Sequence, residues 1–116
     1  MDDLIYFISE FIEKNRQERW KYLASGKWKN FADKLHGLEK HLNNRCVLAE
    51  KNAIQKVEEI IAINKITQGV YVDRNSEPFL MNPIDIKSVK DDSLIICKKN
   101  NIAFFFHHEG WVWMCE

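Results

Sequence analysis

Two histidines stand side by side near the end of the chain and are followed directly by an acid, a combination that can serve metal binding or acid–base catalysis. The residues are His107, His108 and Glu109. The run from Ile102 to His107 is typical of a strand, and neighbouring side chains of a strand point to opposite faces. We therefore expect that the two imidazoles do not share one ion, and we predict no metal site.

The three cysteines, Cys46, Cys97 and Cys115, are the other residues that could carry chemistry. An odd number of cysteines in a chain rich enough in apolar residues to form a core favours a reducing compartment. A reactive thiol needs a nearby base and an electropositive setting. Cys97 beside Lys98 and Cys115 near His108 are the candidates. Buried strand cysteines are commoner, so we predict no catalytic residue, no cofactor and no enzymatic activity.

The strongest local charge bias lies between residues 14 and 29, where basic side chains alternate with Trp20, Tyr22 and Trp28. The basic residues are Lys14, Arg16, Arg19, Lys21, Lys27 and Lys29. Such a pattern can follow a phosphate backbone and stack on bases. It equally fits the solvated face of a helix that turns Trp20 and Trp28 into the core. A nucleic-acid-binding or regulatory module is therefore the alternative function.

Length and composition limit which functions are compatible with the chain. The 116 residues fit one domain, 1–116, and a hydrophobic content of 46% is enough for a core. Seventeen basic and seventeen acidic residues cancel, which argues against a strongly basic nucleic-acid binder or an acidic DNA mimic. No window approaches the roughly 18 apolar residues of a membrane span, and the start lacks a secretory signal. We expect a cytoplasmic protein that does not bind membranes.

Helical periodicity fills much of the first 90 residues. Apolar residues predict a first helix from Asp2 to about Ser25, and a second over residues 28–42 that packs antiparallel on the first. A third helix is expected over residues 53–64. Asn82, Pro83 and Asp85 stand in the order of a helix start, which predicts a short helix to about residue 90.

The residues from about 94 to the end of the given sequence are predicted to form strands. β-rich runs at residues 94–97, 102–107 and 111–115 are separated by turn residues, which predicts an antiparallel meander. A further short strand is expected at residues 70–72, and residues 74–78 are expected to form a mobile loop. The run 46–48 is too short to distinguish a strand from a loop. The predicted fold class is α+β, with N-terminal helices packed on a C-terminal antiparallel β-meander.

The meander has a definite predicted register. In the first hairpin Ile95 pairs with Phe104, and a two-residue turn at residues 109–110 pairs Trp113 with Phe106. Both faces of the sheet are then apolar, whereas one face of a small antiparallel sheet is usually wet. Either helices cover both faces or the sheet curls around a core, or one aromatic face is a docking surface.

Residues 27–45, KWKNFADKLHGLEKHLNNR, are followed by a helix, a strand at 70–72 and the terminal LIICKKNNIAFFFHHEGWVWMCE. This arrangement resembles small, uncharacterised bacterial α+β proteins. In size and style it also resembles the immunity proteins of bacterial polymorphic and contact-dependent toxin systems. Those proteins are cytosolic single domains without catalysis that bind a toxin domain, often over its active site. The resemblance implies a non-enzymatic protein-binding module with a toxin domain as partner, and it carries over no site residue.

The end of the meander is the predicted partner surface. Tryptophan is favoured at binding hot spots, and acids complement a basic cleft. The predicted contact residues are Trp111, Trp113, Glu109, Asp91, Asp92 and Glu116. The competing interpretation places the tryptophans in the core and leaves the acids as solvated turn residues.

Overall fold

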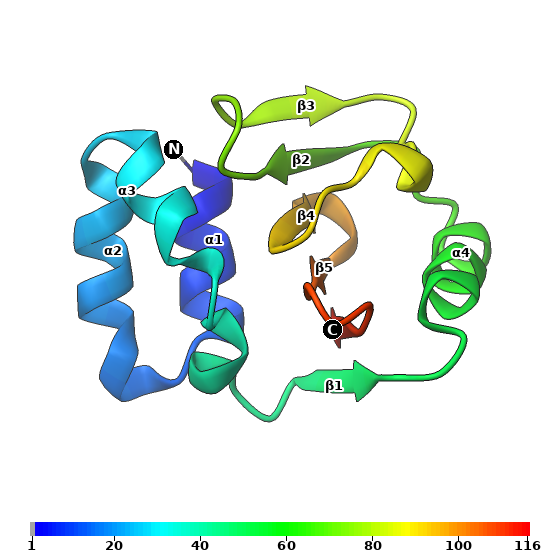
Figure 1. Cartoon of the computed structure of the whole chain (residues 1–116), viewed down its shortest axis with the longest axis horizontal. Coiled ribbons are helices and arrows are strands. Elements are labelled where there is room, and N and C mark those ends of the chain that lie inside the picture. The colour runs from blue at the N-terminus through cyan, green and yellow to red at the C-terminus, as the bar shows by residue number, and fades with distance from the viewer. Residues whose placement is uncertain (1) are drawn as a thin grey trace.

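Six antiparallel strands form one sheet at the centre of the protein in the computed structural model, which describes residues 2–116 (Figure 1). The strand order is β1-β6-β5-β4-β2-β3, so the last strand of the chain lies between β1 and β5. The strands are β1 Cys46–Ala49, β2 Gly69–Val72, β3 Phe79–Met81, β4 Ser93–Cys97, β5 Ile102–Phe106 and β6 Val112–Cys115. The predicted α+β class is confirmed.

Helices cover both faces of this sheet (Figure 1). One face packs against α1 (Asp2–Phe11), α2 (Gln17–Ser25) and α3 (Trp28–Ala32), and the other packs against α4 (Ala53–Ile63). Every side chain of β4 and β5 is buried as a result. Three alternatives were left open for a sheet that is apolar on both faces. In the structure, helices cover both faces.

The predicted helix over residues 2–25 is wrong in one respect, because it is interrupted after Phe11. Ile12 forms a bridge with Leu42, and the backbone N–H of Glu13 donates a 2.8 Å hydrogen bond to the carbonyl of His41. The chain then turns back through a 3-10 turn, Lys14–Arg16, into α2. The antiparallel helical pair therefore consists of α1 and α2 (Figure 1), and the end of α2 at Ser25 is as predicted.

The predicted helix over residues 28–42 is also broken. After α3 the chain continues as two 3-10 turns, Asp33–Leu35 and Leu38–His41, separated by Gly37. Gly37 has φ +98°, which ends the helix and favours glycine. The apolar side chains still reach the core, since Leu35 and Leu38 are fully buried. The break places His36 on an exposed turn rather than on a helix.

The first hairpin of the meander has the predicted register, with Ile95 opposite Phe104, but the second differs by one residue. Trp113 lies opposite Phe105 because the connection between β5 and β6 is a five-residue loop, residues 107–111, and not a two-residue turn. A shift of one residue moves a side chain to the other face of the sheet. Trp113 therefore packs on the side of α1, α2 and α3.

The remaining predictions for the middle of the chain have mixed outcomes. Residues 46–48 are part of a strand, β1, which pairs with β6. The strand predicted at 70–72 is β2, and the unpredicted β3 pairs with it.

The predicted short helix after Asn82 is only a 3-10 turn, Ile86–Ser88. Asp85 rather than Asn82 caps this turn, by accepting a hydrogen bond from the Lys87 N–H. Within residues 2–116 no helix has the length and apolarity needed to cross a membrane.

Replacing Gly37 with alanine is expected to destabilise the protein by about 1–2 kcal/mol, because an L-residue is strained at positive φ. The measurement is equilibrium unfolding in urea. Gly26→Ala is the matched control: φ is −94° at Gly26 and the nearest atom to an added Cβ is 3.7 Å away, so this change is expected to be close to neutral. Equal stabilities of the two variants would contradict the role given to Gly37.

Candidate functional site

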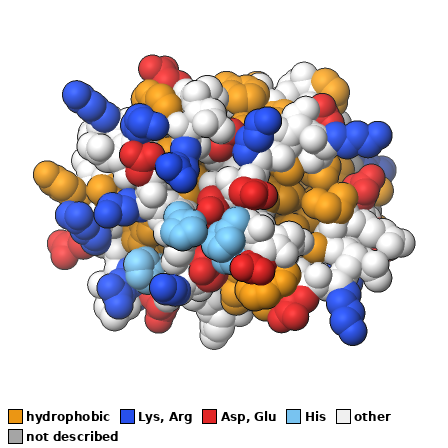
Figure 2. Space-filling model, in the orientation of Figure 1, with side chains coloured by type: hydrophobic (Ala, Val, Ile, Leu, Met, Phe, Trp, Pro, Cys, Tyr) orange, Lys and Arg blue, Asp and Glu red, His pale blue; other side chains and the backbone are white. Residues whose placement is uncertain are grey.

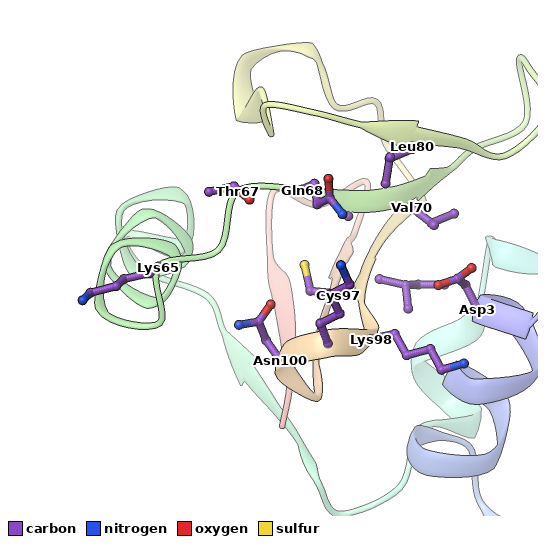
Figure 3. Close-up of a pocket in the computed structure, with 12 residues that line it drawn as sticks. Asp3, Lys65, Thr67, Gln68, Val70, Leu80, Cys97, Lys98 and Asn100 are labelled. Carbon is purple, nitrogen blue, oxygen red and sulfur yellow. The ribbon is translucent and has the colours of Figure 1, made fainter.

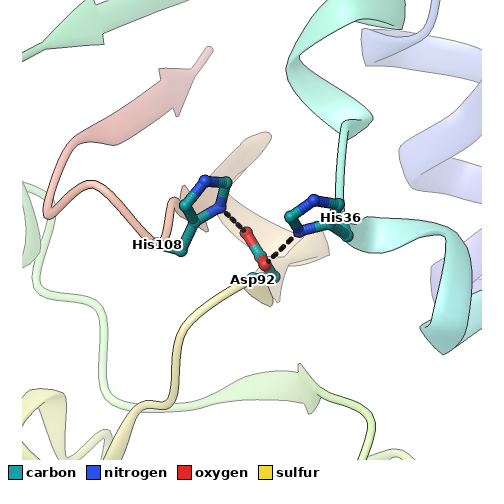
Figure 4. Close-up of side chains that lie close together, drawn as sticks. All are labelled: His36, Asp92 and His108. Carbon is teal, nitrogen blue, oxygen red and sulfur yellow. Dashed lines mark hydrogen bonds and ion pairs between the residues drawn. The ribbon is translucent and has the colours of Figure 1, made fainter.

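A buried carboxylate joins three segments that are far apart in the sequence. Asp92, in the turn before β4, is only 5% exposed and lies between the imidazoles of His36 and His108 (Figure 4). Its two oxygens are 3.0 Å from Nδ1 of His36 and 3.1 Å from Nδ1 of His108. Because an ionised carboxylate only accepts hydrogen bonds, both rings donate from Nδ1. Asp92 thus fixes the orientation of both imidazoles.

Four rings form a continuous stack next to this carboxylate. His36 stacks on His108 at a centroid distance of 4.8 Å, His108 on His107 at 4.0 Å, and His107 on Trp111 at 5.0 Å. The expectation that His107 and His108 point to opposite faces is wrong, because β5 ends at Phe106 and both histidines belong to the loop that follows. Strand alternation does not apply to them.

The buried His107 has a polar contact at each ring nitrogen. Its Nδ1 accepts a hydrogen bond of 3.0 Å from the backbone N–H of Glu109. The ring hydrogen is therefore on Nε2, which faces Oε2 of Glu39 at 3.3 Å. The other oxygen of Glu39, Oε1, is buried and has no hydrogen-bond partner among residues 2–116. We call His36, Glu39, Asp92, His107, His108 and Trp111 the histidine cluster.

Contacts in the cluster shift the pKa values of Asp92 and His108 in opposite directions. Burial alone would raise the pKa of Asp92, but the hydrogen bonds from His36 and His108 outweigh it and the pKa is lowered. The hydrogen bond to Asp92 raises the pKa of His108, helped by the negative charges of Asp92, Glu109 and Glu39 and opposed by partial desolvation. Asp92 is thus ionised at neutral pH, and His108 takes up a proton more readily than a free imidazole.

This geometry allows two kinds of chemistry. An imidazole oriented by a carboxylate can transfer protons. Two histidines and one carboxylate are also a ligand set for zinc and other divalent transition ions. One ligand atom each from His36, Asp92 and His108 lies within 4.8 Å of the other two. Histidine side chains gather with acidic ones near the centre of one face of the molecule (Figure 2).

Most of the predicted partner surface lies at this end of the sheet, but not all of it. Asp92 and Trp111 are in the cluster, and Glu109 Oε1 lies 3.9 Å from His108 Nε2. Asp91 is exposed beside a polar hollow of about 400 Å³ that Lys90 also lines.

The other two predicted contact residues lie elsewhere. Trp113 is half-buried in β6 and packs against the core cluster that α1, α2 and α3 share with the sheet. Glu116 follows β6 at the opposite end of the sheet, where its backbone carbonyl accepts from Arg45 Nε at 2.8 Å. Sequence reasoning also missed His36 and Glu39. The sequence signal that could have indicated them is Gly37. A glycine can break a helix, and here the break places both residues on turns.

The basic stretch of residues 14–29 is less aromatic at its surface than its sequence suggests. Trp20 is buried and donates from Nε1 to Nδ1 of His41 at 3.1 Å. Lys29 is engaged with the carbonyl of Arg74 and lies 3.6 Å from Asp33. Of the basic residues, Lys21 is half-buried, and those exposed to solvent are Lys14, Arg16, Arg19, Lys27 and Lys29.

The opposite end of the sheet carries a pocket of about 360 Å³ between the start of β2 and the end of β4 (Figure 3). Lys65, Lys98 and Asn100 lie at its rim and Cys97 in its wall. Gly69 allows this close approach of strands, because an added Cβ would lie 2.7 Å from Cγ2 of Ile95. Burial raises the pKa of Cys97 to about 12, so its thiol is protonated at neutral pH despite the nearby lysines.

Comparisons with known proteins add no assignment. No protein-family model, no curated protein and no solved structure matches this chain. The histidine cluster is therefore interpreted from its own geometry and charge.

Replacing Asp92 with asparagine is expected to lower the pKa of His108 towards the ordinary value near 6.5, because the acceptor loses its charge. The measurement is an NMR titration of the histidine ring protons. The matched control is Asp91→Asn, since Asp91 is exposed and makes no bond to either imidazole. A His108 pKa that both variants leave unchanged would contradict the assigned hydrogen bond.

All three thiols are expected to be unreactive in the folded protein. Cys46, Cys97 and Cys115 are buried, and burial raises the pKa of Cys97 and Cys115, which suppresses the nucleophilic thiolate. The measurement is the rate of reaction with 5,5′-dithiobis(2-nitrobenzoate) before and after unfolding in guanidinium chloride. We expect three thiols to react only after unfolding. Rapid reaction of Cys97 in the folded state would contradict this description of the pocket wall.

Proposed function

We propose that this chain is a non-enzymatic intracellular protein-binding module, of the immunity type, that binds a bacterial toxin domain and blocks its catalytic cleft. The observation that supports the proposal is the convergence of exposed acids and a half-buried indole at one end of the sheet. Asp91 and Glu109 are exposed there, and Trp111 is partly accessible beside them. Tryptophan is enriched at binding hot spots, and charged residues near it add electrostatic complementarity to a partner.

The chemistry of this surface suits a basic partner. Exposed carboxylates complement the positively charged cleft of an enzyme that acts on nucleic acid, and such complementarity speeds association and selects partners. Trp111 is held by its stack on His107, so little side-chain freedom would be lost when a partner binds. We therefore place the contact at Asp91, Glu109 and Trp111, and leave out Trp113 and Glu116.

The proposal is tested with the toxin domain encoded next to this chain's own gene, by co-purification and by protection of cells that express the toxin. We expect the complex to form, and Glu109→Lys to weaken it at least about tenfold, since like charges placed opposite each other cost several kcal/mol. Glu58→Lys is the matched control: it reverses an exposed charge on α4, which contributes no residue to the proposed surface, and is expected to leave binding unchanged.

Two outcomes would overturn the proposal. The first is that the chain neither binds the neighbouring toxin domain nor protects against it. The second is salt-dependent binding of oligonucleotides that Arg16→Glu and Arg19→Glu abolish, because this result would favour the alternative of a nucleic-acid-binding module acting through residues 14–29.

A further inference from the structure

The separations inside the histidine cluster already approach those of a metal site. A tetrahedral zinc ion with bonds of about 2.0–2.1 Å keeps its ligand atoms about 3.3 Å apart. The two nitrogen–oxygen distances at Asp92 are 3.0 and 3.1 Å, and no pair of the three candidate ligand atoms is more than 4.8 Å apart. The two rings would have to rotate so that both Nδ1 atoms face the same ion.

We propose that His36, Asp92 and His108 form a binding site for a divalent first-row transition ion such as Zn²⁺. The ion takes the place of the two hydrogens that the rings now share with the carboxylate. Each neutral imidazole then carries its hydrogen on Nε2 and offers the Nδ1 lone pair to the ion. Two nitrogens and a carboxylate oxygen suit a borderline-soft ion better than Ca²⁺ or Mg²⁺, which prefer oxygen ligands.

Neighbouring contacts restrict the three ligands before any ion arrives. The Asp92 side chain is 7% exposed and sits on a backbone with φ +54°, so the surrounding turn fixes where its oxygens point. His108 is sandwiched between the rings of His36 and His107. His107 is in turn fixed by Glu109 and Glu39 through its two nitrogens. Such outer contacts are what orient ligating side chains in metal sites.

The site is open to solvent and surrounded by negative charge. The side chains of His36 and His108 are 64% and 36% exposed, which leaves a route for the ion and room for water to complete its coordination. Asp92, Glu109 and Glu39 all act on His108 as negative charges. A cation is stabilised in this field. The sequence prediction of no metal site was made from His107, His108 and the cysteines, and it did not consider His36 with Asp92.

Binding of the ion has a structural consequence that can be measured. His36 belongs to the helical layer on one face, whereas Asp92 and His108 lie at the ends of β4 and β5. An ion bound by all three cross-links these parts only in the folded state, so it stabilises that state by mass action. The site does not depend on the proposed function, and it is tested on the isolated chain.

The test is titration of the whole purified chain with ZnCl₂ by isothermal calorimetry and equilibrium dialysis, together with thermal unfolding. We expect one ion per chain and a rise in the melting temperature that EDTA reverses. His36→Ala is the main variant, because an exposed turn residue can be changed with the fold intact; it is expected to weaken zinc binding at least about tenfold. Asp92→Asn and His108→Ala are expected to do the same.

The matched control is His41→Asn. His41 lies outside the three-ligand set. Its side chain accepts one hydrogen bond, from Trp20, which the asparagine oxygen can also accept, so zinc binding is expected to be unchanged. Co²⁺ as a substitute ion should show a spectrum without a thiolate charge-transfer band. The proposal is overturned if the folded chain takes up no zinc, if His36→Ala and His108→Ala bind it as the parent does, or if cobalt reports thiolate ligands.

Discussion

Burial of both faces of β4 and β5 is the constraint on which the rest of this structure depends. All ten of their side chains are buried, and a sheet of this kind needs an apolar layer on each side. The chain supplies three helices for one face and α4 for the other. Once both faces are covered, polar groups next to the sheet can gather only at its edges and its two ends. The histidine cluster occupies one end and the Cys97 pocket the other.

Asp92 illustrates how polar groups are accommodated next to such a core. A buried carboxylate is costly unless it is hydrogen-bonded, and here two imidazoles from distant segments satisfy both oxygens. Glu39 has one oxygen 3.3 Å from Nε2 of His107, and its other oxygen is buried without a hydrogen-bond partner among residues 2–116. The cluster therefore does more than end the sheet: it ties the turn at His36 to the loop after β5, and it concentrates proton-carrying and ion-binding groups in one accessible place.

The sequence was informative where local periodicity and turn chemistry decide the structure. The α+β class, the strands β2, β4, β5 and β6 and the β4–β5 register followed from residue patterns alone, whereas β1 was left open and β3 was missed. The register of β6 did not, because nothing local distinguishes a two-residue turn from the five-residue loop that places Trp113 opposite Phe105. The pairing of His36 with Asp92 spans 56 residues and depends on the helix break at Gly37. Such long-range contacts are set by packing, which periodicity does not report.

The position of β6 has a consequence for how the chain can fold as it is synthesised. The strand made last lies between β5 and β1, and β1 was made more than sixty residues earlier. Until residues 112–115 leave the ribosome, β1 has no partner and one side of β5 is an unpaired edge. Exposed edges of this kind invite pairing with other chains. Closure of the sheet therefore waits for β6, whatever has formed before it.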